Sequence, residues 1–246
     1  MFYMNFNSRF IGLALVCALA GLSSAACSGE DVSAQKVDES LTQIPFNKVT
    51  LNDNFWLPRL QIQKKTLVPF SLEKTESAVE NLRRVGAYLR GEKVTEQFTG
   101  PYYVASDLFK VMEGAACLLT LEKDAELEKQ MDKIIDVIAA AQAPDGYLYE
   151  HHILPKHLRN PHNYAGDTPY SYVVHSHELY NMGHMYEAAI AYYRATGKRK
   201  WLDVAEKNAR HINKVFFEGD PNYNGGKPIM QAPGHEEIEV ALVKMY

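Results

Sequence analysis

Residues 187–197 read Glu-Ala-Ala-Ile-Ala-Tyr-Tyr-Arg-Ala-Thr-Gly, an apolar helical stretch that stops at a glycine. A glycine directly after a helical pattern is a common C-terminal signal of a helix. A similar start at Glu113-Gly-Ala-Ala runs on to a polar turn that ends at Asp124. A third start lies at Glu239, and no stop signal follows it before Tyr246. We therefore interpret the chain as a helical repeat whose third copy is incomplete.

Each of the first two stretches is followed, after a short turn, by a second helical pattern. Apolar residues recur at helical spacing over 127–143 and again over 201–216. The sequence thus predicts helical hairpins that repeat about every 70 to 75 residues. Such hairpins cannot bury their apolar faces alone, and either a superhelical array or an α/α toroid would supply neighbours. Long loops at only one end of each hairpin favour an all-α fold, an incomplete α/α toroid of the six-hairpin type.

Upstream of these hairpins the pattern is less regular. Residues 44–51 alternate apolar and polar side chains, which predicts a short strand. Asp53 precedes an aromatic segment in the manner of a helix cap. Helices are predicted over 60–70, where Pro69 marks a break or a new start, and over 77–89.

Residues 1–27 have the composition of an export signal, with an apolar run too short to span a bilayer comfortably. Two processing routes stay open. One is signal cleavage near Ala26, and the other is lipoprotein processing that leaves Cys27 lipidated, although Ser24 stands where such signals usually carry leucine. Both predict export to the periplasm or cell envelope of a bacterium, and a lipidated Cys27 would attach the protein to the membrane, as in an outer-membrane lipoprotein. Residues 28–43 are predicted to form a flexible tether.

Composition excludes some classes of function. A net charge of −4 over 246 residues gives no basic footprint for nucleic acid. The 15 Tyr and 10 Phe are numerous, and we assign most of them to core packing. The three cysteines are Cys17 and Cys27 near the N-terminus and Cys117 in an apolar helical stretch, which predicts a buried inert thiol. They offer neither a disulfide framework nor a cysteine-based metal site within this chain.

Candidate binding residues lie where helical patterns begin after the long loops. Ser176-His177-Glu178 and Gly234-His235-Glu236 each open a helix with a histidine followed by a glutamate. A carboxylate in the first turn interacts favourably with the helix dipole, which explains both glutamates. The histidines have less structural reason to be there. We interpret His177 and His235 as groups that bind sugar hydroxyls at the open end of the ring.

A second candidate is Tyr147, which follows the turn Pro144-Asp145-Gly146. The turn alone only ends a helix. Because several α/α-toroid carbohydrate enzymes carry an Asp-Gly-Tyr loop at the mouth of the cleft, Tyr147 is also a candidate sugar contact.

Seven of the nine histidines fall between residues 151 and 184, but their spacing along the chain is poorly suited to binding one metal ion. His177 and His184 lie about two helical turns apart, and the adjacent His151 and His152 do not easily face one ion, so we predict no internal metal site. Glycoside hydrolysis needs two groups that flank the scissile bond. Spacing alone selects no pair from the candidate carboxylates, which are Asp145, Glu150, Glu178, Glu236 and Glu237.

Five segments, in order, resemble the bacterial β-L-arabinofuranosidase-type glycoside hydrolases, family 127 and its relatives. They are Asn54-Phe-Trp56, Ser106-Asp-Leu-Phe-Lys110, Ala141-Gln-Ala-Pro-Asp-Gly-Tyr-Leu148, Ser176-His-Glu-Leu-Tyr-Asn-Met-Gly-His-Met-Tyr-Glu-Ala-Ala-Ile-Ala-Tyr192 and Gly234-His-Glu-Glu-Ile-Glu-Val-Ala-Leu242. No segment is decisive alone, but their ordered sum is fairly specific. The resemblance covers residues 44–246 and identifies them as the N-terminal part of a catalytic domain.

The resemblance implies an α/α-toroid domain followed by β-sandwich domains, and a retaining enzyme that removes β-linked L-arabinofuranose from plant glycans. It also implies a zinc-bound cysteine thiolate as nucleophile, a glutamate as acid/base, and one glutamate and three cysteines as zinc ligands. No cysteine follows Cys117, so we expect the catalytic residues beyond Tyr246, no metal on this chain, and no activity of residues 28–246 alone. The sugar contacts that carry over are His177 and His235.

Two alternatives stay open at this point. One is another α/α-toroid carbohydrate enzyme, such as an unsaturated glycuronyl hydrolase or a sugar epimerase. The other is a non-catalytic glycan-binding helical-repeat protein. In the leading interpretation, the partner of this chain is a plant arabinose-containing oligosaccharide.

Overall fold

The computed structural model of the chain describes residues 44–162 and 164–246. The predicted export signal, tether and lipidation at Cys27 lie outside these residues. Within them every regular element is a helix, and none of these helices is both long and apolar enough to cross a bilayer. All the elements belong to the unit Pro45–Tyr246.

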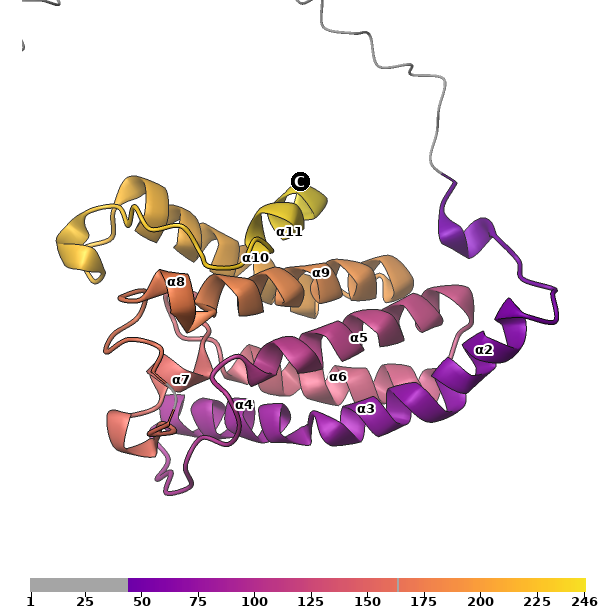
Figure 1. The fold of residues 1–246 in the computed structure, drawn as a ribbon, viewed down its shortest axis with the longest axis horizontal. Coiled ribbons are helices and arrows are strands. Elements are labelled where there is room, and N and C mark those ends of the chain that lie inside the picture. Colours follow the sequence, from indigo (N-terminus) through magenta and orange to yellow (C-terminus); the bar gives the residue numbers. More distant parts are fainter. Residues whose placement is uncertain (1–43, 163) are drawn as a thin grey trace, which may run out of the picture. The chain divides into compact units, whose positions relative to one another are not determined.

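The elements follow one another as short and long helices (Figure 1). In chain order they are η1 (Phe46–Lys48), α2 (Trp56–Ile62), η2 (Gln63–Leu67), α3 (Val68–Lys74), α4 (Glu76–Leu89), α5 (Val104–Leu121), α6 (Ala125–Ala140), α7 (Glu150–Ile153), η3 (Lys156–Leu158), α8 (Val173–Ser176), α9 (Glu178–Thr196), α10 (Lys200–Asn213), η4 (Lys214–Glu218), η5 (Asn224–Gly226) and α11 (Ile238–Met245).

The two predicted hairpins are confirmed as α5–α6 and α9–α10. Gly197 ends α9 in the left-handed conformation, with φ of 75°, as its sequence position predicts. Asp124 opens α6, where its carboxylate accepts a 3.1 Å hydrogen bond from the backbone N–H of Leu127. Cap residues therefore set both short turns. This explains why local signals in the sequence, apolar spacing together with caps, were enough to locate the hairpins.

The predicted strand over residues 44–51 is wrong. The segment contains the short helix η1, and all of its residues are exposed. Alternating apolar residues form a strand only beside another strand, and the described part of the chain offers none. Downstream, the prediction for Asp53 is confirmed, because its carboxylate accepts hydrogen bonds from the backbone N–H groups of Phe55 and Trp56. Pro69 lies in the first turn of α3, where a helix tolerates proline.

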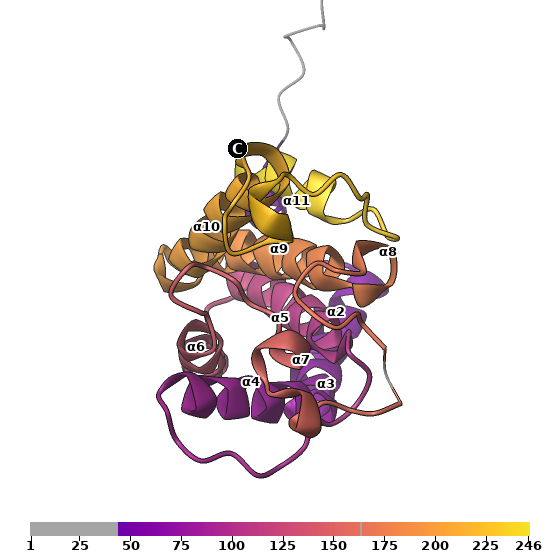
Figure 2. The same ribbon diagram turned by 90° about the vertical axis from the view of Figure 1, so that its left-hand side faces the viewer.

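The long helices pack in two rows (Figures 1 and 2). In one row α9 lies between α5 and α11, and in the other α6 lies between α4 and α10. Each hairpin joins a helix of the first row to one of the second. The N-terminal ends of α5, α9 and α11 therefore come from separate parts of the sequence but belong to one row.

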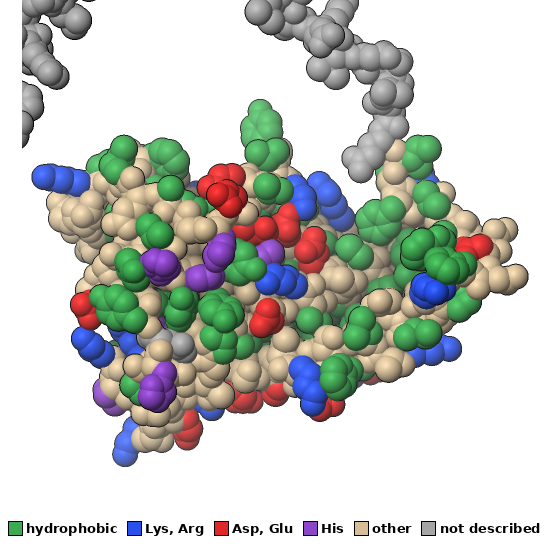
Figure 3. All heavy atoms as spheres, viewed as in Figure 1, with side chains coloured by type: hydrophobic (Ala, Val, Ile, Leu, Met, Phe, Trp, Pro, Cys, Tyr) green, Lys and Arg blue, Asp and Glu red, His purple; other side chains and the backbone are tan. Residues whose placement is uncertain are grey.

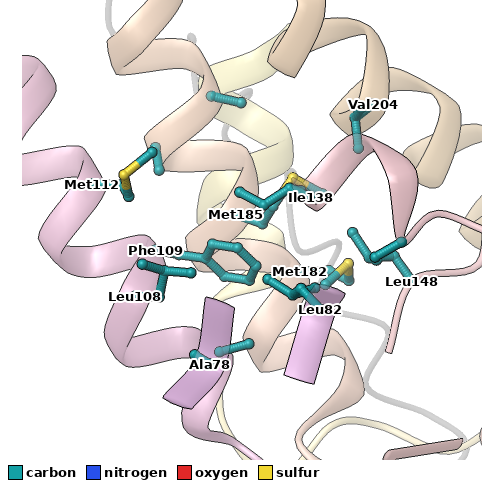
Figure 4. Close-up of a cluster of buried hydrophobic side chains, with 14 of the residues drawn as sticks. Ala78, Leu82, Leu108, Phe109, Met112, Ile138, Leu148, Met182, Met185 and Val204 are labelled. Atoms are coloured by element: carbon teal, nitrogen blue, oxygen red, sulfur yellow. The ribbon is translucent and has the colours of Figure 1, made fainter. Parts of the chain in front are cut away.

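The core lies between the rows (Figure 4). Phe109 of α5 and Trp201 of α10 are fully buried, with ring centroids 6.4 Å apart. Side chains such as Leu82, Ile138 and Met185 fill the space from the helices on either side. Burial of each large apolar side chain contributes about 1.5–3 kcal/mol, so this cluster holds the two rows together.

Two glycines allow the segment before α11 to pack tightly on the rest. A Cβ atom at Gly183 would lie 2.5 Å from Cγ of Glu237 and 2.9 Å from the backbone N of Ile238. A Cβ atom at Gly234 would overlap the backbone carbonyl oxygen of Val174. Only glycine fits at either contact, so these two positions fix where α11 begins relative to α9.

Substitution Gly183→Ala should destabilise the fold by about 1–3 kcal/mol, because the added methyl group forces α11 away from α9. Urea unfolding measures the effect. Gly114→Ala in α5 is the matched control, since a Cβ there meets nothing within 4 Å. It should stabilise by about 0.5–1 kcal/mol through helix propensity. Equal effects of the two substitutions would contradict the close contact.

Candidate functional site

A buried carboxylate organises the loop that precedes α9. The Glu178 side chain is 1% exposed and accepts hydrogen bonds from three sides. Tyr147 donates its hydroxyl at 2.5 Å and Ser176 its hydroxyl at 2.6 Å. The backbone N–H of Tyr170 lies 3.0 and 3.2 Å from the two carboxylate oxygens. Charge-assisted hydrogen bonds of this kind compensate the cost of burying an ionised group.

His152 extends this network toward a second part of the loop. Its Nδ1 lies 3.1 Å from Oε1 of Glu178 and 3.2 Å from the hydroxyl of Tyr147. Its Nε2 lies 3.2 Å from the carbonyl oxygen of Gly166. The side chain is fully buried, so His152 acts as a bridge inside the loop.

The network encloses two strained backbone positions. Tyr170 and His177 have φ of 57° and 58°, and they are two of the three described non-glycine residues with positive φ. Such conformations are uncommon outside glycine and persist where the surroundings impose them. Glu178 bonds the backbone N–H of the first and directly follows the second, so its carboxylate holds both in place.

The two histidines predicted from the helix starts meet in space. His177 and His235 have ring centroids 4.7 Å apart, and the ring of Tyr180 lies 5.5 and 5.4 Å from them. Nδ1 of His177 lies 2.6 Å from the carbonyl oxygen of His175, which can only accept. Nδ1 therefore carries the proton, and burial lowers the pKa of His177, so its Nε2 is free to accept a hydrogen bond.

Aromatic side chains that the sequence did not single out complete this cluster. Tyr102 and Tyr103, in the connection before α5, have ring centroids 5.2 and 5.1 Å from that of His177. Lys110 of α5 donates a 2.8 Å hydrogen bond to the hydroxyl of Tyr180. We refer to this group as the histidine–tyrosine cluster, which comprises Tyr102, Tyr103, His177, Tyr180 and His235. Figure 3 shows histidine side chains gathered on the face that carries α9 and α11.

Tyr147 lies elsewhere. Its side chain is 4% exposed and its hydroxyl is bonded to Glu178. The turn before it is confirmed, with Asp145 accepting a hydrogen bond from the backbone N–H of Tyr147 at 3.0 Å and one from the hydroxyl of Tyr223 at 2.6 Å. The structure therefore places Tyr147 beneath the loop as a support, and a direct sugar contact from this residue stays a prediction.

Of the candidate carboxylates, two are fully buried and have different environments. Glu178 is surrounded by donors, as described. Glu150 is 2% exposed, and its Oε1 has no hydrogen-bond partner among the described residues. Burial raises the pKa of Glu150 to about 7. Glu236 is exposed beside His235, and Glu237 packs on α9.

The zinc–cysteine centre implied by the resemblance does not fit the described residues. Their free cysteine is Cys117, on α5. Burial and the nearby Glu113 raise the pKa of the Cys117 thiol, which favours the protonated form. Cys117 also belongs to no group of three potential metal ligands among the described residues, so the structure does not assign it that role.

Replacing Glu178 with glutamine should destabilise the chain by about 2–3 kcal/mol, because an amide nitrogen cannot accept from Ser176 or Tyr170. The free energy of unfolding in urea measures this. Glu236→Gln is the matched control, since Glu236 also follows a histidine at a helix start but is exposed. It should change stability by less than about 0.5 kcal/mol. Similar values for both variants would show that the network does not support the loop.

Glu150 should make stability depend on pH. Its raised pKa means that the folded state holds the proton more tightly than the unfolded state. Its stabilising contribution is therefore present below the ordinary pKa of 4.5 and is lost as the pH rises through about 7. Glu150→Gln should thus be more stable than the parent at pH 8, by on the order of 3 kcal/mol, and similar to it near pH 5. Unfolding curves from pH 5 to 8 test this, and parallel profiles would contradict it.

Comparisons with known proteins agree with this geometry. Residues 48–246 match the family described as beta-L-arabinofuranosidase, GH127 catalytic domain. A non-reducing end beta-L-arabinofuranosidase of Bifidobacterium longum subsp. longum is 35% identical over 169 residues, which cover 69% of this chain and 23% of the relative.

Two solved structures are similar as well. A GH127 beta-arabinofuranosidase matches with a TM-score of 0.71 and 36% identity, over 82% of this chain and 31% of that chain. A GH127 beta-L-arabinofuranosidase from Geobacillus stearothermophilus T6 matches with a TM-score of 0.68 and 36% identity, over 80% of this chain and 29% of that chain.

The chain thus spans less than a third of the length of each of these relatives. The described helices and the structural matches confirm the predicted all-helical α/α-toroid fold. Since the match covers most of the sequence, the chain belongs to the GH127 beta-L-arabinofuranosidase catalytic-domain family.

Proposed function

We propose that this chain supplies part of the sugar-binding site of a glycoside hydrolase that removes β-linked L-arabinofuranose from glycans. The observation that carries the proposal is the contact between His177 and His235, whose ring centroids lie 4.7 Å apart. Each comes from a different helix start, and neither residue has a packing role that requires imidazole. The family relationship supports the choice of sugar.

The chemistry of the histidine–tyrosine cluster suits a small neutral sugar. Nε2 of His177 is a hydrogen-bond acceptor for a hydroxyl group. Tyrosine rings offer apolar faces for the C–H groups of a furanose and phenol hydroxyls for its oxygens. Tyr180 is held in place by Lys110, which leaves its ring against both histidines. The cluster can therefore orient a sugar through several directional contacts.

The same arrangement assigns Tyr147 a supporting role. Its hydroxyl is used by Glu178, which fixes the loop that ends at His177. In this proposal Tyr147 positions the sugar-binding histidine from below. The acid/base and the nucleophile are assigned to none of the described residues, because Glu178 is engaged by the loop and Cys117 has no metal-ligand group around it among them.

The sequence adds further parts to the proposal. In this proposal residues 1–27 act as an export signal to the periplasm or cell envelope of a bacterium, and Cys27 becomes the lipidated anchor. A plant arabinose-containing oligosaccharide is the proposed substrate. Zinc is the proposed cofactor of the complete catalytic domain, held by residues other than those described.

Binding of methyl β-L-arabinofuranoside to the full chain tests the proposal. His177→Ala and His235→Ala should each raise the dissociation constant about tenfold. This loss of affinity corresponds to about 1.4 kcal/mol, as expected for one lost hydrogen bond. Titration calorimetry or saturation-transfer NMR measures the affinity. His157→Ala is the matched control, because His157 is exposed in the short helix η3, outside the histidine–tyrosine cluster, and it should bind like the parent.

Unchanged binding in both histidine variants would refute the proposed site. A preference for an unsaturated glucuronyl disaccharide over the arabinofuranoside would instead favour the glycuronyl-hydrolase alternative. Circular dichroism of each variant confirms that a loss of binding does not reflect a loss of fold.

A further inference from the structure

A second group of side chains, next to the histidine–tyrosine cluster, lies between α9 and the start of α11. His184 and Glu187 stand three residues apart on α9 and so share a face of the helix. Glu237 joins them from the segment that packs against Gly183. One ligand atom from each of the three residues lies within 4.8 Å of the others.

These atoms are enclosed, and although the carboxyl groups of Glu187 and Glu237 interact with each other, three of the polar atoms have no partner. The three side chains are only 10 to 16% exposed. Neither ring nitrogen of His184, nor Oε1 of Glu237, has a hydrogen-bond partner among the described residues. Nδ1 of His184 lies 3.2 Å from Oε1 of Glu237, yet the two do not form a hydrogen bond. Buried polar atoms left without partners are rare and costly, so this group calls for a ligand.

We propose that His184, Glu187 and Glu237 form a binding site for a divalent transition-metal ion, with Zn²⁺ as the preferred ion. Imidazole nitrogen and carboxylate oxygen are both zinc ligands, at about 2.0–2.2 Å from the metal. Donors around one tetrahedral ion therefore lie about 3.3–3.6 Å apart, and small side-chain rotations bring the three atoms to that spacing. The fourth position is left for water or another ligand.

This site differs in chemistry from a cysteine-ligated zinc centre. Its donors are one imidazole and two carboxylates, and no thiol belongs to the set. It also lies apart from Glu178, so metal binding here does not depend on the loop network. The group adjoins the histidine–tyrosine cluster, since the rings of His184 and Tyr180 have centroids 4.6 Å apart, but its argument does not rest on the proposed sugar.

Lys244 provides a test of the proposed site, because it occupies one of the metal ligands. Its ammonium group, on α11, forms an ion pair with Oε1 of Glu187. A lysine on that oxygen competes with a metal ion for the same carboxylate. Figure 3 shows acidic and basic side chains gathered over α9 and α11. Removing the ammonium group should therefore strengthen metal binding, whereas removing a metal ligand should weaken it.

The test uses the full chain, which is first dialysed against a chelator to remove bound metal. It is then titrated with Zn²⁺, and calorimetry measures the heat of binding. One ion per chain is expected, and the thermal midpoint should rise with Zn²⁺ concentration. His184→Asn and Glu237→Gln should each weaken binding at least tenfold. Lys244→Met should bind Zn²⁺ more tightly than the parent, a change in the opposite direction that misfolding cannot produce.

His157→Ala is again the control and should bind one ion like the parent, which excludes this exposed histidine as the source. Co²⁺ gives a second readout, because its visible absorption reports nitrogen and oxygen ligands without a thiolate band. Absence of Zn²⁺ binding, or equal affinity in the parent and the His184→Asn and Glu237→Gln variants, would overturn the proposal.

Discussion

The conformation of the loop that precedes α9 depends on the hydrogen bonds that the buried carboxylate of Glu178 accepts. A buried carboxylate is costly unless donors surround it. Here the donors come from three separate places between α6 and α9, namely Tyr147, Tyr170 and Ser176. Because all of them converge on one group, the loop can adopt a single conformation over the helix start.

That conformation determines the direction of His177. The residue sits in the left-handed region immediately before Glu178, and its Nδ1 is bonded to a backbone carbonyl. Its free nitrogen therefore has a fixed direction. His235 reaches the same place by a different route, since the contacts made possible by Gly183 and Gly234 bring its segment onto α9 and α8. Two independent constraints thus create one pair of imidazoles.

Local signals in the sequence were enough to predict the long helices, whereas short ones such as α7 and α8 lie where loops were expected. Apolar spacing and the cap residues Asp124 and Gly197 located the two hairpins and their turns. The same reasoning failed for residues 44–51, because alternation is informative only where a partner strand exists. The ordered motifs identified the family, and the comparisons confirm it.

The site was only partly predictable. His177 and His235 stood out because a histidine at a helix start lacks a structural reason. The helix-dipole explanation of Glu178 was incomplete, since its carboxylate also accepts hydrogen bonds from Tyr147 and Tyr170, earlier in the chain. Tyr102 and Tyr180 carry no periodic signal that separates a site from a core, and only the packing of α5 against α9 brings them to His177.

The most direct test is a crystal structure of the chain with methyl β-L-arabinofuranoside bound. The account predicts sugar hydroxyl groups within hydrogen-bond distance of Nε2 of His177 and of the His235 ring, with Glu178 still enclosed by its loop donors. A sugar bound away from both histidines, or one in direct contact with the Glu178 carboxylate, would contradict it.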